Sequence, residues 1–103
     1  MTAVVDLREE HAATLRAVLT AHLPPGARAY VFGSRAHGGA RQYSDLDVAL
    51  EWERPVGFDI LGRVAEALSD SDLPFKVDIV DLATVEPAFK ARISRGWIPF
   101  ELT

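Results

Sequence analysis

The sequence predicts an α/β (α+β) domain in which a small mixed β-sheet carries helices packed on one face. Short apolar segments typical of strands alternate with longer segments whose apolar residues recur at helical spacing, in the order helix, strand, strand, helix, strand, helix. The link between the first two strands is short, and a parallel crossover needs a dozen or more residues, so antiparallel neighbours are expected. At 103 residues, residues 1–103 are expected to form a single domain.

The first half of the chain is predicted to contain one helix and two strands. Apolar residues at helical spacing favour a helix from Leu7 to about His22, begun by a capping arrangement of Asp6 with Glu9. A Pro-Pro-Gly turn then leads to a strand over Arg28–Phe32. The second strand is expected from Ser44 to about Trp52.

The second half is predicted to add two helices and a third strand. The expected elements are a helix over Phe58–Leu68, a strand from Phe75 to Val80 or Asp81, a helix capped by Thr84 with Pro87 in its first turn and Gly96 at its end, and a short strand or apolar tail over Trp97–Leu102.

Composition excludes several classes of protein. No apolar run approaches the roughly 18 residues that span a bilayer. No membrane segment is therefore expected. The N-terminus lacks the basic region of a secretory signal, so the cytoplasm is the expected location. The chain has no cysteine, which excludes disulfides and thiolate metal sites. Its net charge of −4 argues against tight nucleic-acid binding, which usually needs a basic surface.

Two carboxylates open the second predicted strand. Asp45 and Asp47 lie two residues apart, so on a strand they share one face, roughly 7 Å apart along the chain. Asp78 lies in an otherwise apolar strand, where an acid is costly unless it is paired or metal-bound. Carboxylate oxygens are preferred ligands of Mg²⁺. We therefore expect these acids to hold two magnesium ions, with Asp78 able to take a proton from an attacking hydroxyl.

A Gly-Ser turn precedes the two acids. Residues 33–39 are predicted to form a loop with one helical turn after Ser34. Gly33 lets the backbone approach phosphate oxygens closely, and Ser34 offers a hydroxyl and an amide. Arg35 can add a charge-assisted contact to a triphosphate. A phosphate-binding turn beside a pair of metal-binding acids indicates a nucleotidyl-transfer site.

Each of these residues also has a purely structural interpretation. The Gly-Ser pair can be a simple turn, and the two acids can be solvated residues at the mouth of a strand. Asp78 can pair with Arg28 or Lys76. Asp81 is a rival for the third acid, although its position at the strand end favours capping of a turn. Tyr43 can pack under the loop or stack on a base.

The signature of the DNA polymerase beta-like nucleotidyltransferase superfamily resembles two segments of this chain, Gly33-Ser34-Arg35-Ala36-His37-Gly38 and Ser44-Asp45-Leu46-Asp47-Val48-Ala49. The resemblance extends from Ala27 to the Arg92–Phe100 stretch. It is strongest to the minimal nucleotidyltransferases (MNT). Members of that branch are stand-alone prokaryotic catalytic domains and often the antitoxin partners of HEPN-domain ribonuclease toxins.

The resemblance implies a nucleotidyltransferase fold and a role for each residue. Gly33 and Ser34 would hold the triphosphate. Asp45 and Asp47 would bind Mg²⁺, and Asp78 would be the third catalytic acid. The implied reaction transfers AMP from ATP to a hydroxyl, with pyrophosphate leaving. In the antitoxin branch, the acceptor is a tyrosine hydroxyl on the toxin.

One position departs from the family pattern. The residue after Ala36 is commonly arginine and is His37 here. Histidine is only partly charged at pH 7. If His37 binds phosphate, weaker or pH-sensitive nucleotide binding is therefore expected.

Two other functions stay open from the sequence. The chain can neutralise a partner by binding alone, without catalysis, or it can transfer a nucleotide to a small molecule of the aminoglycoside kind. A domain of this length has little room for acceptor recognition. We therefore expect a partner protein, or a homo- or hetero-oligomer, to supply the acceptor.

Overall fold

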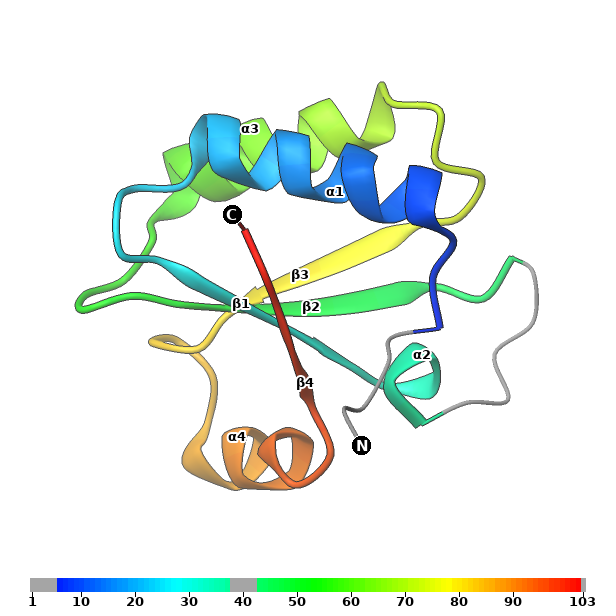
Figure 1. The fold of residues 1–103 in the computed structure, drawn as a ribbon. Coiled ribbons are helices and arrows are strands. Elements are labelled where there is room, and N and C mark those ends of the chain that lie inside the picture. The colour runs from blue at the N-terminus through cyan, green and yellow to red at the C-terminus, as the bar shows by residue number, and fades with distance from the viewer. Residues whose placement is uncertain (1–5, 38–42, 103) are drawn as a thin grey trace.

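A four-stranded sheet forms the centre of the fold, with helices on both of its faces (Figure 1). The structure is a computed structural model that describes residues 6–37 and 43–102. Its elements are α1 (Glu9–His22), β1 (Arg28–Phe32), α2 (Ser34–His37), β2 (Leu46–Glu51), α3 (Phe58–Ser69), β3 (Val77–Asp81), α4 (Pro87–Ser94) and β4 (Ile98–Phe100). Within these ranges, no helix combines the length and the apolar character that crossing a bilayer requires.

The strands of the sheet run in both directions. Their order is β3-β2-β1-β4, with β1 antiparallel to β2 and β4, and β2 parallel to β3. The predictions of a mixed sheet and of antiparallel first strands are therefore confirmed. The parallel pair is possible because α3 provides the long crossover from β2 to β3.

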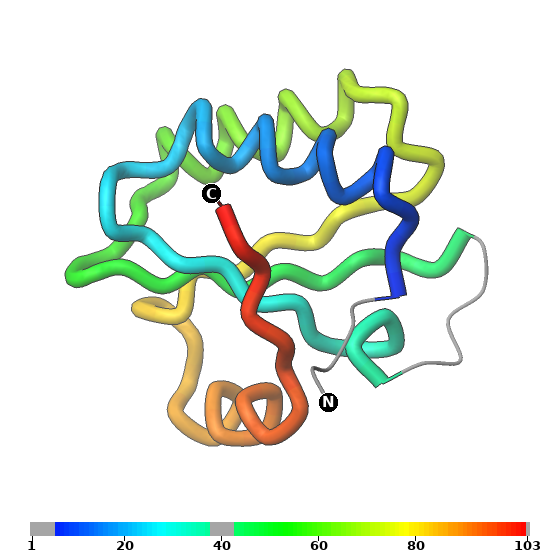
Figure 2. The backbone as a smooth tube through the Cα atoms, viewed as in Figure 1, coloured from blue at the N-terminus to red at the C-terminus, as the bar shows by residue number. Residues whose placement is uncertain are grey.

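The core lies between the sheet and the helices α1 and α3, which run side by side over one face (Figure 2). The sheet contributes alternate residues such as Val31 and Val48, both fully buried. Each helix contributes one apolar stripe, with Leu15 and Leu19 from α1 and Val64 from α3. Burial of these side chains is the main force that holds the strands in register.

Helix α4 lies on the other face of the sheet (Figure 2). The Phe89 ring meets Phe32 of β1 edge to face, with 6.2 Å between ring centroids. Trp97, just beyond α4, stacks on Tyr30 of β1 at 4.0 Å. Because α4 connects β3 to β4, the two edge strands, it has to cross the sheet, and it does so on the face that α1 leaves uncovered. The expected one-sided packing thus describes α1 and α3, with α4 as the exception.

Helix α1 begins at Glu9 rather than at Leu7. Its N-cap is Arg8 and no side chain caps the first turn, so the predicted capping by Asp6 with Glu9 is wrong. The Asp6 backbone has other partners, because its amide donates to the Arg35 carbonyl at 2.8 Å and its carbonyl accepts from Arg35 Nη1 at 3.0 Å. The segment before α1 is thereby held toward α2 and does not extend the helix.

The predicted cap of α4 is also wrong. The N-cap residue is Glu86, with Pro87 in the first turn as expected. The Thr84 hydroxyl instead donates to the Asp81 carbonyl at 3.0 Å, within the turn that follows β3. The Thr84 hydroxyl therefore bonds within this turn and does not form the helix cap that the sequence pattern predicted.

Asp81 is a buried carboxylate that ties two connections together. It is only 3% exposed. Its Oδ2 accepts from the Val56 amide at 2.8 Å, with the Gly57 amide at 3.5 Å, and its Oδ1 accepts from the Ala83 amide at 3.1 Å. These bonds attach the link between β2 and α3 to the end of β3. The prediction that Asp81 caps a turn is therefore confirmed.

Replacement of Asp81 by Ala should destabilise the fold by about 3 kcal/mol, because it leaves buried amides without an acceptor. Urea unfolding monitored by circular dichroism measures the change. The control is Asp72→Ala, since Asp72 is exposed in a loop and its loss should change stability by less than about 0.5 kcal/mol. Equal stabilities for the two variants would show that Asp81 does not have this role.

Candidate active site

Two of the predicted acids come together on the face of the sheet away from α1 and α3, which we call the open face. Asp47 of β2 lies opposite Asp78 in the parallel pair with β3, and opposite Phe32 in the antiparallel pair with β1. Residues in register share a face, so both carboxylates are on the side away from α1 and α3. They lie near the start of β2, at the end of the sheet where α2 is found (Figure 1).

Gly33 is in direct contact with the Asp47 carboxylate. Its backbone has φ +77°, a conformation that favours glycine, and a Cβ at this position would overlap the Asp47 side chain. The structure therefore joins the predicted phosphate-binding turn to the predicted metal-binding acid. Ser34 follows as the exposed first residue of α2. The predicted helical turn after the glycine is confirmed.

Asp45 and Asp78 are both accessible to solvent. β2 begins at Leu46 rather than at Ser44, so Asp45 precedes the strand and is exposed. Asp78 is 42% exposed and lies 3.3 Å from Lys76 Nζ, so the ion pair considered from the sequence is present. An exposed pair of this kind contributes little free energy, and it leaves Asp78 accessible from the open face.

The pKa of Asp47 is raised, chiefly because partial burial disfavours its charged form. The negative charges of Asp78 and Asp45 raise this pKa further. A bound cation would remove this repulsion. The three acids therefore share an electrostatic environment that favours a cation.

The donor set suits Mg²⁺ with an incomplete protein shell. Among residues 6–37 and 43–102, no three histidine, cysteine or acidic side chains are grouped closely enough to hold a metal ion. The three carboxylates are therefore not grouped as a preformed metal site, although Asp78 and Asp45 both lie close enough to raise the pKa of Asp47. Mg²⁺ is commonly bound by one or two carboxylates with water and substrate phosphates. Asp47 and Asp78 fit that pattern.

Arg35 is directed away from the open face, and its contact with a triphosphate stays a prediction that none of its described contacts supports. It is 6% exposed. Its Nε and Nη2 donate to the Ser44 carbonyl at 3.1 and 2.9 Å, and its guanidinium carbon lies 4.2 Å from the centre of the Phe75 ring. Together with the bond to Asp6, these contacts use Arg35 to hold three segments around α2.

His37 ends α2 and packs against the link between α4 and β4. It is exposed, and a Cβ on Gly96 would overlap its imidazole ring. α4 ends at Ser94 with Arg95 as its C-cap, so Gly96 lies just beyond the helix. The nearness of His37 gives a separate reason for a glycine at position 96. Phosphate binding by His37 stays a prediction. The part of the predicted loop over residues 38–42 lies outside the described residues.

Tyr43 is 65% exposed, which disfavours the packing interpretation among the two alternatives that the sequence left open. Sequence reasoning missed one feature of this site. The contact of Gly33 with Asp47 was not foreseen, although a glycine two residues after the buried Val31 was a signal for close approach.

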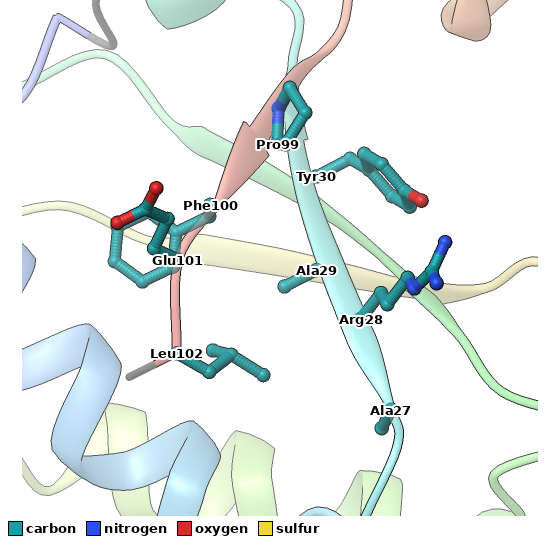
Figure 3. Close-up of a pocket in the computed structure, with 8 residues that line it drawn as sticks. All are labelled: Ala27, Arg28, Ala29, Tyr30, Pro99, Phe100, Glu101 and Leu102. Carbon is teal, nitrogen blue, oxygen red and sulfur yellow. The ribbon is translucent and has the colours of Figure 1, made fainter.

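A separate pocket of about 440 Å³ lies along β1 and the C-terminal segment (Figure 3). In Figure 3, Arg28 and Tyr30 extend to one side of β1, while Glu101 extends from the segment that follows β4. This pocket does not include the acids of the open face. It is therefore distinct from the candidate active site.

Comparison with known proteins identifies the family. The model of the polymerase beta nucleotidyltransferase family matches residues 14–98. The probable protein adenylyltransferase MntA of Haemophilus influenzae is 38% identical over 96 residues, which cover 93% of this chain and 83% of the relative. The chain therefore belongs to the polymerase beta nucleotidyltransferase family, and the prediction of a nucleotidyltransferase is confirmed.

Solved structures agree with the fold. A putative minimal nucleotidyltransferase is 31% identical with a TM-score of 0.67, over 87% of this chain and 89% of that one. A toxin–antitoxin complex with AMP-PNP contains a chain that is 23% identical with a TM-score of 0.75, over 89% of this chain and 73% of that one. The predicted nucleotidyltransferase fold and the resemblance to the minimal branch are thus confirmed.

Gly33→Ala should lower stability by roughly 1–3 kcal/mol, because alanine is strained at positive φ and its methyl group would displace the Asp47 carboxylate. Urea unfolding measures the effect. The matched control is Gly62→Ala, because Gly62 lies in α3 with open space around it. That change should stabilise the protein by up to about 1 kcal/mol. A Gly33→Ala variant as stable as Gly62→Ala would contradict the contact.

Asp47→Asn should stabilise the metal-free protein at neutral pH. Because the pKa of Asp47 is raised in the folded state, the folded protein holds this proton more tightly than the unfolded chain, and ionisation costs stability. The cost is absent below the unfolded pKa of about 4 and appears as the pH rises through the folded pKa. Thermal unfolding in EDTA should show the advantage of Asp47→Asn growing from about pH 3 to about pH 7.

The response of Tm to Mg²⁺ gives a second comparison between the wild type and Asp47→Asn. A cation that binds only the folded state stabilises it, so Mg²⁺ should raise the Tm of the wild type more than that of Asp47→Asn. If the variant is no more stable than the wild type at pH 7 in EDTA, the repulsion described here does not exist. An equal response of both proteins to Mg²⁺ would remove Asp47 from the metal site.

Proposed function

We propose that this protein transfers AMP from ATP, with Mg²⁺, to a tyrosine hydroxyl of a HEPN-domain toxin and thereby acts as its antitoxin in the cytoplasm. The observation that carries the proposal is the pair of carboxylates in register on the open face, one of which, Asp47, packs directly on the Gly33 turn. The relative named a probable protein adenylyltransferase supports this choice of reaction, and the toxin–antitoxin complex solved with AMP-PNP supports the choice of a toxin as the partner.

Each residue at the open face has its own role in this reaction. Asp47 and Asp78, with Asp45 beside them, would hold Mg²⁺, which would supply charge neutralisation at the phosphates. The Gly33 backbone approaches the triphosphate closely, and Ser34 adds its hydroxyl and amide. The acceptor oxygen forms a bond to the α-phosphorus, the bond from that atom to the bridging oxygen breaks, and pyrophosphate leaves. The Asp78 carboxylate takes the proton of the acceptor hydroxyl.

A second candidate is an antitoxin that neutralises its partner by binding alone. The observation that favours it is the lack, in the described part of the chain, of a preformed group of three metal-binding side chains. The two candidates differ in whether the carboxylates are needed for neutralisation. A variant that lacks these carboxylates can therefore separate them.

The test is ATP-dependent labelling of a HEPN-domain protein that is co-expressed with this one. Incubation with Mg²⁺ and ATP should add AMP to a tyrosine of that partner, detected by mass spectrometry. Asp47→Asn should reduce the labelling rate at least about 100-fold, since loss of a metal ligand costs no less than loss of its supporting contacts. Asp72→Asn, in an exposed loop, is the control and should label at the rate of the wild type.

Protection of cells from the partner distinguishes the two candidates. The double variant Asp45→Asn, Asp47→Asn should fail to protect cells if AMP transfer is the function. Full protection by this variant would instead establish neutralisation by binding. Unchanged labelling by Asp47→Asn would show that the proposed site is wrong.

A further inference from the structure

Phe58 is a large apolar side chain that the fold leaves in solvent. Among the described residues, only Phe58 and Tyr43 are large hydrophobic residues with high exposure, at 93% and 65%. Tyr43 precedes Asp45 at the rim of the candidate active site. Phe58 is the first residue of α3. Aromatic side chains, Phe among them, are enriched in the cores of protein interfaces.

Phe58 lies at the opposite end of the sheet from the carboxylates. The bonds from Asp81 to the amides of Val56 and Gly57 place this segment beyond the C-terminal ends of β2 and β3. Asp47 and Asp78 lie near the starts of the same strands, about 10 Å away along the strand direction. In Figure 1 the start of α3 and the helix α2 accordingly lie at opposite ends of the sheet. Phe58 therefore does not line the nucleotide site.

A hollow lies directly beside the exposed ring. Its volume is about 560 Å³, and it is lined by Val56, Gly57, Phe58, Asp59, Ile60 and Arg63. The space above the Gly57 backbone is open, because a Cβ there would meet no atom within 4 Å. We call these six residues the Phe58 patch. The patch thus contains both a protruding aromatic ring and a space that can receive one.

The charges of the Phe58 patch are balanced. Asp59 and Arg63 lie four residues apart on α3, and neither forms an ion pair with another described residue. The whole chain, in contrast, has a net charge of −4. Two copies of this chain therefore repel each other over much of their surfaces, and a patch with one acid and one base is a favourable place for them to meet.

We propose that the Phe58 patch binds a second copy of this chain in a two-fold symmetric dimer. In such an interface the same surface is used by both copies, so it must be complementary to itself. The Phe58 patch meets this condition, with a ring beside a hollow and an acid beside a base. Each Phe58 enters the hollow of the other copy, and Asp59 of one copy faces Arg63 of the other.

In this dimer, the interface and the candidate active site lie at opposite ends of the sheet. The dimer buries the end of the sheet where α3 begins, and the carboxylates at the other end stay accessible in both copies. Dimerisation is therefore independent of nucleotide binding and of the acceptor. The inference does not depend on the proposed function.

The test is the molar mass of the full chain in solution, measured by light scattering after size exclusion and by sedimentation over a range of concentrations. The wild type should dimerise, and Phe58→Ser should weaken dimerisation by roughly 30-fold or more, the effect of losing an interface anchor. Tyr43→Ser is the matched control, because it removes the other exposed aromatic ring, and it should leave the dimer unchanged. Serine is well tolerated at a helix N-terminus, so Phe58→Ser should keep the Tm of the monomer fold.

Charge exchange tests the symmetry of the interface. Asp59→Arg alone and Arg63→Asp alone should each weaken the dimer, and the double variant should restore it. A wild type that is monomeric at every concentration would overturn the proposal, as would a dimer that survives Phe58→Ser or is lost in Tyr43→Ser. Loss of binding to another protein in Phe58→Ser, with the wild type monomeric, would assign the Phe58 patch to that protein and also overturn the proposal.

Discussion

The contact between the Gly33 turn and the Asp47 carboxylate is the constraint on which the site depends. No side chain fits between them, so β1 and β2 bring the turn and the acid together directly. The pairing of Phe32 with Asp47 sets this contact, and a slip of one residue would turn the carboxylate toward the buried face. The core between the sheet and the helices α1 and α3 fixes that register. Packing on one face of the sheet therefore determines the chemistry that the other face can perform.

Arg35 extends this constraint to the loops around α2. Its guanidinium holds the Asp6 and Ser44 carbonyls and lies against the Phe75 ring. A planar guanidinium with five donors can serve several acceptors at once, which a lysine cannot do in the same geometry. Because Ser44 immediately precedes Asp45, the position of the exposed acid relative to α2 depends on this buried cation. A residue of the signature thus supports the site without facing it.

Most of the fold and the centre of the site could be predicted from the sequence, because both depend on short-range patterns. Alternation along β2 and β3 predicts that Asp47 and Asp78 face away from the core, and the short link predicts the antiparallel first pair. The role of Arg35 could not be predicted, since an arginine after a Gly-Ser turn suits a phosphate as well as a carbonyl. Only Phe75 and Ser44, placed by tertiary packing, decide between them. The caps expected from Asp6 and Thr84 failed for the same reason, because tertiary or turn partners took those groups.

The crossing of the sheet by α4 has a consequence for the motions of the molecule. None of its residues is buried, and the ring contacts to β1 come from Phe89 within it and from Trp97 just beyond it. The free energy needed to detach such a helix is much smaller than that needed to open the core between α1, α3 and the sheet. We therefore expect amide hydrogens of α4 to exchange with solvent through local opening, and those of β1 and β2 to exchange only when the whole domain unfolds. One wall of the open face can loosen while the strands that hold Asp47 and Asp78 stay fixed.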